Sequence, residues 1–140
     1  MEKYVFDNGL KLIYEHRPGK VSSVCIGFGA GALEEGEYFS KGTAHALEHV
    51  ISKGTKKRSE DDINIQLDRI FGFENAMTNY PYTIYYGTCF SEDLHKGIEL
   101  YSDMILNASF PKTGFKEEMN IIFQELKEWK DNAYQYCEDL

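Results

Sequence analysis

The sequence has no basic excess, no paired cysteine spacing and no long run of apolar residues. Its formal net charge of −8 disfavours nucleic acid and anionic membrane surfaces as partners, because both bind basic patches. The three cysteines are far apart and show no CxxC spacing, so neither a disulfide framework nor a cysteine-ligated zinc site is indicated. The N-terminus does not resemble a signal peptide, and no apolar run is long enough to span a membrane. We therefore expect a cytoplasmic protein that binds neither nucleic acid nor membrane.

The chain does contain enough apolar side chains for a folded domain. Hydrophobic residues make up 42% of its 140 positions and aromatic residues 14%. This composition argues against disorder. A single domain of this length buries about two-thirds of the surface that its unfolded chain exposes.

Turn signals, helix caps and hydrophobic periodicity predict the order β-β-β-α-α-β-β-α-α. Ser59 with Asp62 is typical of a capping box, and Ser91 is expected to cap a later helix with Glu92 and Asp93 in its first turn. This order predicts an α+β fold with helices packed on one face of a mostly antiparallel sheet. The predicted strands are Lys3–Phe6, Leu10–Glu15, Val21–Phe28, Phe73–Asn79 and Tyr82–Phe90, and the predicted helices include Gly42–Ser52, Ser59–Gly72 and Gly114–Tyr136.

Five consecutive residues, His45-Ala46-Leu47-Glu48-His49, carry the strongest chemical signal. Two histidines four positions apart lie one turn apart on the same face of a helix, where both can reach one zinc ion. Glu48 projects beside that face, within reach of a water held by the metal. The order H-x-x-E-H is the inverzincin signature, the reverse of the commoner H-E-x-x-H. The alternative is a chance pattern on a solvated helix.

A catalytic zinc site needs a third protein ligand and an open position for water. His16 and His95 lie in polar stretches without a second ligand nearby, so both are expected at the surface. The last predicted helix offers Glu118 and Glu125, two turns apart at the border of its apolar face. Carboxylates at such a border need a cation or a hydrogen-bond partner, unless both face water. The apolar stripe of this helix comprises Phe115, Met119, Ile122, Leu126, Trp129 and Ala133.

Several further motifs follow in order along nearly the whole chain. They are Gly42-Thr43-Ala44 before the five-residue motif, then Lys53-Gly54-Thr55, Asn75-Ala76-Met77-Thr78, Thr83-Ile84-Tyr85-Tyr86, and Glu118 with Ile122-Phe123-Gln124-Glu125-Leu126. In these segments the sequence resembles the pitrilysin/insulinase-like zinc peptidases, inverzincins that include the mitochondrial processing peptidases. The separation of His49 and Glu125 also agrees with this family.

The resemblance implies a zinc-dependent metalloendopeptidase with one Zn²⁺ per catalytic site and a processing-peptidase-like roll as its fold. His45, His49 and Glu125 are then the metal ligands. Glu48 is the general base that takes a proton from a zinc-bound water, whose pKa the metal lowers to about 7. Glu118 would orient one of the ligating histidines.

The resemblance also suggests where a substrate binds. Asn75 and Ala76 fall in the strand that, in this family, pairs with an extended peptide by strand addition. The alternative is an ordinary edge strand. We favour the substrate role because asparagine is uncommon in the middle of a strand.

The length departs from the resembled family, whose members enclose a chamber between two homologous halves that are each longer than 140 residues. We interpret residues 1–140 as the N-terminal segment of a zinc-peptidase catalytic domain, an incomplete half that requires a C-terminal half or a partner subunit, in a homo- or hetero-oligomer. Alone it should hold zinc more readily than it cleaves peptides. Two alternatives stay open: a non-catalytic peptide-binding or scaffold subunit of this family, and a plain acidic domain with an accidental motif.

Overall fold

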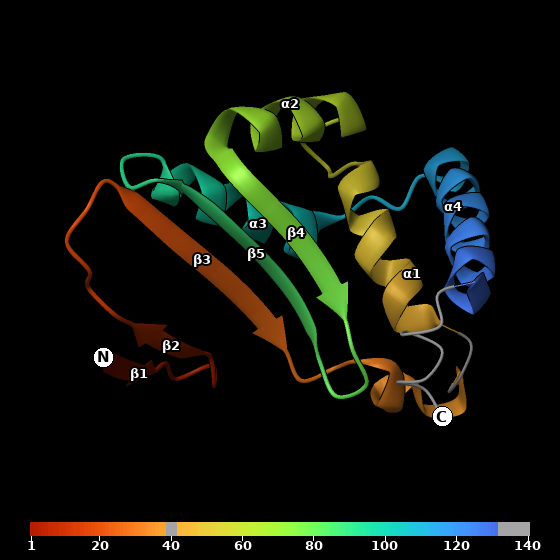
Figure 1. The fold of residues 1–140 in the computed structure, drawn as a ribbon, viewed down its shortest axis with the longest axis horizontal. Coiled ribbons are helices and arrows are strands. Elements are labelled where there is room, and N and C mark those ends of the chain that lie inside the picture. Colours follow the sequence, from red (N-terminus) through yellow and green to blue (C-terminus); the bar gives the residue numbers. More distant parts are fainter. Residues whose placement is uncertain (39–41, 132–140) are drawn as a thin grey trace.

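The computed structural model describes residues 1–38 and 42–131, without the side chains of residues 38 and 129–131 (Figure 1). The strands and helices follow the predicted order, and two 3₁₀ segments, η1 and η2, are added to it. The elements are β1 (Glu2–Val5), β2 (Lys11–Tyr14), β3 (Val21–Phe28), η1 (Ala32–Tyr38), α1 (Thr43–Val50), η2 (Ile51–Lys53), α2 (Glu60–Ile70), β4 (Phe71–Thr78), β5 (Thr83–Phe90), α3 (Leu94–Asn107) and α4 (Lys112–Asp131).

Three antiparallel strands form the main sheet in the order β3–β5–β4. α3 lies behind β5 and β3 in Figure 1, while α1 and α2 contact β4. The core between helices and sheet includes Ile63 of α2 and Leu100 and Tyr101 of α3, which are fully buried. On β5, alternate residues face these helices and are buried: Thr83, Tyr85, Gly87 and Cys89. The predicted α+β fold, with helices on one face of an antiparallel sheet, is therefore confirmed.

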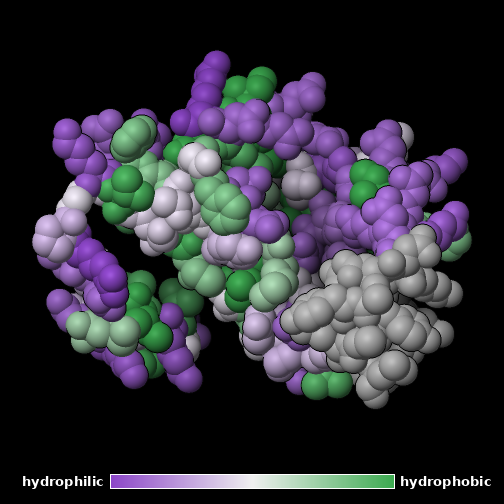
Figure 2. Space-filling model, in the orientation of Figure 1, coloured by the Kyte–Doolittle hydropathy of each residue, from purple (hydrophilic) through white to green (hydrophobic). Residues whose placement is uncertain are grey.

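The opposite face of the sheet is open in the part of the chain that the structure describes. The register places Val21, Phe73, Met77 and Phe90 on this face, and all four are exposed. Figure 2 shows hydrophobic residues among weakly polar ones over these strands. The β1–β2 hairpin is a separate two-stranded sheet whose residues are all exposed. Exposed apolar patches of this kind typically mark contact surfaces.

The helices of residues 1–38 and 42–131 do not meet the requirements of a membrane span. None of the helices described there combines the length and the apolar character that a membrane span requires.

The Ser59 capping box is confirmed. The Ser59 side chain accepts from the Asp62 N–H, and the Asp62 carboxylate accepts from the Ser59 N–H. The predicted Ser91 cap is wrong, because α3 begins at Leu94 with no side-chain cap and no acidic residue in its first turn. Ser91 instead extends the β3–β5 pairing, since its N–H donates to the Lys20 carbonyl at 2.8 Å.

The predicted burial of the α4 stripe is also wrong for Phe115 and Leu126, both of which are exposed. The reason is that α4 packs mainly on α1 and presents Glu118 to it rather than the centre of the stripe. Ala133, the predicted helix end at Tyr136 and the side chain of Trp129 lie outside the described part of the chain.

Candidate metal centre

The five-residue motif lies on α1, and two local features stabilise the first turn of this helix. Gly42, at the N-cap, has φ 71° and ψ 27°, a left-handed conformation that favours glycine. Glu35 of η1 accepts a hydrogen bond from the Ala44 N–H at 2.8 Å. A carboxylate at this end satisfies a backbone donor and complements the helix dipole. The helix thus begins just before His45, so that His45 and His49 share one side of it.

Three possible ligand atoms converge between α1 and α4. The Nε2 atoms of His45 and His49 lie 3.1 Å apart, and Oε2 of Glu125 lies 3.6 Å from each of them. In a tetrahedral zinc site with bonds of about 2.05 Å, the ligand atoms lie about 3.3 Å from one another. The observed separations bracket this value, so the three residues fit one tetrahedral zinc ion, which would have a fourth position for water.

Glu118 is a partner of His49 rather than a member of the converging set. Its Oε2 lies 2.8 Å from Nδ1 of His49, and its side chain is 7% exposed. Burial opposes the ionised form of this carboxyl, but hydrogen bonds from Lys53 and His49 hold its pKa below the ordinary value. A histidine that donates through Nδ1 keeps the lone pair of Nε2 for a metal ion.

Glu48 is held where α1 meets the sheet. Its Oε2 accepts a hydrogen bond from Oγ1 of Thr78, at the end of β4. Burial, assisted by the negative charge of Glu48, raises the pKa of Tyr85 to about 12. Tyr85 therefore remains a neutral phenol beside this carboxylate at neutral pH. Glu48 is thus oriented by Thr78 and lies outside the three converging ligand atoms.

Asn75 and Ala76 lie in the middle of β4, at one edge of the three-stranded sheet. Oδ1 of Asn75 accepts a hydrogen bond from the Ala76 N–H at 2.8 Å. A strand added at this edge would compete for that N–H, so the Asn75 side chain affects how a peptide could pair there. Because α1 contacts β4, this edge lies next to the metal centre (Figure 1).

A mostly apolar cavity of about 390 Å³ lies on another side of α1. Its lining includes Leu47 and Ile51 of α1, Tyr85 of β5 and Phe110. None of the three converging residues lines it, so the cavity is separate from the metal centre.

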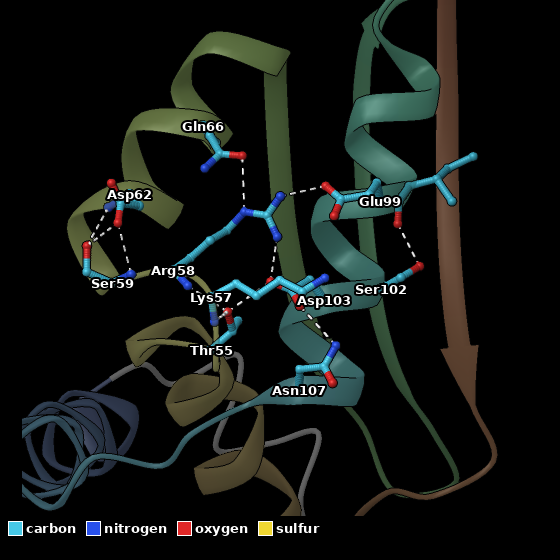
Figure 3. Close-up of polar contacts among 11 residues, drawn as sticks. Thr55, Lys57, Arg58, Ser59, Asp62, Gln66, Glu99, Ser102, Asp103 and Asn107 are labelled. Atoms are coloured by element: carbon cyan, nitrogen blue, oxygen red, sulfur yellow. Dashed lines mark hydrogen bonds and ion pairs between the residues drawn. The ribbon is translucent and has the colours of Figure 1, made fainter.

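A polar cluster anchors the segment that follows α1 and η2 (Figure 3). Oγ1 of Thr55 donates to the Asp103 carboxylate at 2.8 Å, and the Arg58 guanidinium contacts the same carboxylate at 2.5 Å and Glu99 at 2.6 Å. Burial disfavours the charge of Asp103, but hydrogen bonds from Thr55, Arg58 and Asn107 keep its pKa below the ordinary value. The cluster therefore ties this segment to α3.

The structure thus brings together His45, His49, Glu118 and Glu125, which are far apart in the sequence or separated by a helical turn. It places Glu48 beside them and the predicted substrate residues on the adjacent strand. Lys53 and Thr78 stand in two of the family motifs, but the sequence alone assigns neither of them a role. For Lys53 the sequence does hold a signal of proximity to the site, because this residue is four positions after His49.

A sequence model of the insulinase family, peptidase family M16, matches residues 11–140, and the chain belongs to this family. Mitochondrial-processing peptidase subunit beta of Rattus norvegicus is 33% identical over 133 residues, which are 95% of this chain and 27% of that protein. The uncharacterized zinc protease YmxG of Bacillus subtilis is 32% identical over 142 residues, covering 100% of this chain and 34% of that protein.

The fold agrees with this family. A protease from Helicobacter pylori has a TM-score of 0.83 at 25% identity, and the match covers 94% of this chain and 32% of that one. The resemblance to insulinase-like peptidases is therefore confirmed. The chain spans about a quarter to a third of the length of these relatives.

Proposed function

We propose that this chain carries the zinc site of a cytoplasmic metalloendopeptidase that hydrolyses peptides. The observation that carries the proposal is the convergence of three ligand atoms at separations suited to one zinc ion. Membership of a peptidase family and similarity to a zinc protease support it. The cytoplasmic location is inferred from the sequence alone.

His45, His49 and Glu125 would hold the zinc ion, which when bound supplies a Lewis acid that lowers the pKa of a water to about 7. Glu48 acts as the general base, and its carboxylate accepts a proton as the water attacks the peptide carbonyl. Thr78 orients that carboxylate through its hydroxyl. Thr78 holds Glu48 and Glu118 holds His49, while Glu125 reaches the site from α4.

The substrate is an extended peptide that adds to the edge of β4 beside the metal centre. The backbone of Ala76 offers an N–H to a peptide carbonyl, and the side-chain amide of Asn75 offers a second polar contact. This arrangement would place a peptide bond next to Glu48, because β4 carries both the substrate edge and Thr78.

A second homologous half or a partner subunit, in a homo- or hetero-oligomer, would complete the active site. The chain covers 27% of the rat relative and 34% of the Bacillus relative, and apolar side chains are exposed on β1, β2 and the open sheet face. The isolated chain is therefore expected to be inactive or weakly active as a peptidase.

Metal analysis of the purified chain tests the ligand assignment. The wild type should bind one zinc ion, and both His49→Ala and Glu125→Gln should lose it, because each removes one of three ligands. Glu48→Gln is the matched control: it should keep zinc but abolish turnover in the complete enzyme. Unchanged zinc content in either ligand variant would contradict the assignment.

A non-catalytic scaffold or peptide-binding subunit is the second candidate, because the chain covers only part of its peptidase relatives. Mixing the chain with a C-terminal half of a peptidase of this family distinguishes the two. Peptide hydrolysis that depends on Glu48 would exclude the scaffold role, whereas peptide binding without hydrolysis would favour it.

A further inference from the structure

Lys53 lies where α2, α4 and the end of η2 meet, next to the candidate metal centre. Its Nζ is 2.6 Å from Oε1 of Glu118 and 2.5 Å from Oε1 of Glu60. The side chain is 12% exposed, so the ammonium is largely withdrawn from water. A lysine this buried needs carboxylate partners, and both partners are present.

The two oxygens of Glu118 are divided between two partners. Oε1 accepts from Lys53, and Oε2 accepts from Nδ1 of His49 at 2.8 Å. A buried carboxylate with both oxygens engaged has one orientation, whereas loss of one partner leaves a desolvated oxygen that favours rotation toward another donor. The position of Lys53 therefore affects the hydrogen bond that fixes the tautomer of His49.

Lys53 is itself held by packing. Gly114 of α4 lies against its aliphatic stem, and a Cβ added at Gly114 would be 2.9 Å from the Lys53 Cβ and 3.1 Å from its Cγ. The segment immediately after Lys53 is tied to α3 through Thr55 and Asp103 (Figure 3). The stem and the ammonium are thus both constrained.

An alternative is that Lys53 simply joins helices through ion pairs. Arg58 provides a direct comparison, because it is 16% exposed and also contacts two carboxylates, Asp103 and Glu99. Among the described residues, neither of these carboxylates forms a hydrogen bond or an ion pair with His45, His49 or Glu125. If Lys53 has a role in the metal centre, its substitution should weaken zinc binding, whereas substitution of Arg58 should not.

We propose that Lys53 is a positioning residue of the metal centre. Its ammonium fixes the Glu118 carboxylate, and Glu118 holds His49 with the Nε2 lone pair directed toward His45 and Glu125. This role rests on the proposed zinc site and adds to it the contacts of Lys53 with Glu118 and of Glu118 with His49.

The test measures zinc affinity by competition with a chromophoric chelator for the wild type, Lys53→Met, Glu118→Met and the double variant. Groups that orient metal ligands typically contribute 10- to 100-fold in affinity, so Lys53→Met should weaken zinc binding about tenfold. If Lys53 acts through Glu118, the double variant should bind about as weakly as Glu118→Met alone. Independent effects that multiply in the double variant would overturn the proposal.

Arg58→Met is the matched control. It should lower thermal stability while leaving the zinc affinity within about twofold of the wild type. Equal losses of affinity in Arg58→Met and Lys53→Met would show a general structural effect and would overturn the proposal. Wild-type protein that binds no zinc would instead overturn the proposed function.

A second pair of variants covers the case in which Lys53→Met does not fold. Lys53→Arg keeps the cation and should retain most of the affinity, while Glu60→Gln should lower it several-fold by weakening the hold on Lys53. Unchanged affinity in Glu60→Gln would contradict the proposal. The cobalt-substituted protein gives an independent readout, because a displaced His49 alters the visible spectrum of the metal.

Discussion

Asp103→Asn removes the charge from a buried carboxylate outside the metal centre that accepts hydrogen bonds from three side chains. Asp103 is buried and accepts hydrogen bonds from Thr55, Arg58 and Asn107. Hydrogen bonds to a charged group contribute about 1.5–3 kcal/mol each. The amide retains only one accepting oxygen, so at least one of the three donors loses its acceptor. Arg58 is not left unpaired, because its exposed ion pair with Glu99, worth about 1 kcal/mol or less, is kept. We therefore expect a loss of about 2–3 kcal/mol in the free energy of unfolding at pH 7, measured by urea denaturation.

The pH dependence checks the cause. The pKa of Asp103 is below its ordinary value of 3.8 in the folded protein, so its contribution is present above pH 3.8 and is lost as the pH falls through the folded pKa. The difference in unfolding free energy between the wild type and Asp103→Asn should therefore shrink below pH 3.8. A difference under about 0.5 kcal/mol at pH 7, or one that is constant at acid pH, would refute this reasoning.

Three further variants test separate features. Ser59→Ala removes a confirmed capping box and should cost about 1 kcal/mol in urea denaturation, whereas no change would mean that α2 does not depend on its cap. Gly114→Ala should destabilise the chain and weaken zinc binding, because the clash with Lys53 outweighs the gain of about 1 kcal/mol in helix propensity; a more stable variant would contradict the close approach. Thr78→Val removes the hydroxyl that holds Glu48 and should lower kcat about tenfold in the complete enzyme with unchanged zinc content; unchanged turnover would exclude this role.

Local chemistry made most of the fold predictable from the sequence. The Ser59 cap depends on neighbouring residues alone, and each predicted strand and helix is present. Ser91 shows where local rules fail, because a serine at the end of a strand pairs as well with β3 as it would cap a helix.

The candidate site was predictable to the extent that spacing on one helix determines it. His45, Glu48 and His49 follow from helical geometry, while Glu125 came from the family resemblance and from its position on the border of a stripe. The contacts of Lys53 and Thr78 could not be predicted, because they depend on how α2, α4 and β4 approach α1. The exposure of Phe115 likewise depends on which face of α4 meets α1.

The most direct test of the zinc centre is to locate the metal and its ligands in the purified chain. X-ray absorption at the zinc edge, combined with anomalous diffraction from crystals grown with zinc, gives both the ligand types and the site. We expect one zinc ion bound by Nε2 of His45, Nε2 of His49 and a carboxylate oxygen of Glu125, with bonds of about 2.0–2.2 Å. Zinc bound elsewhere, or a site that lacks Glu125, would contradict this expectation.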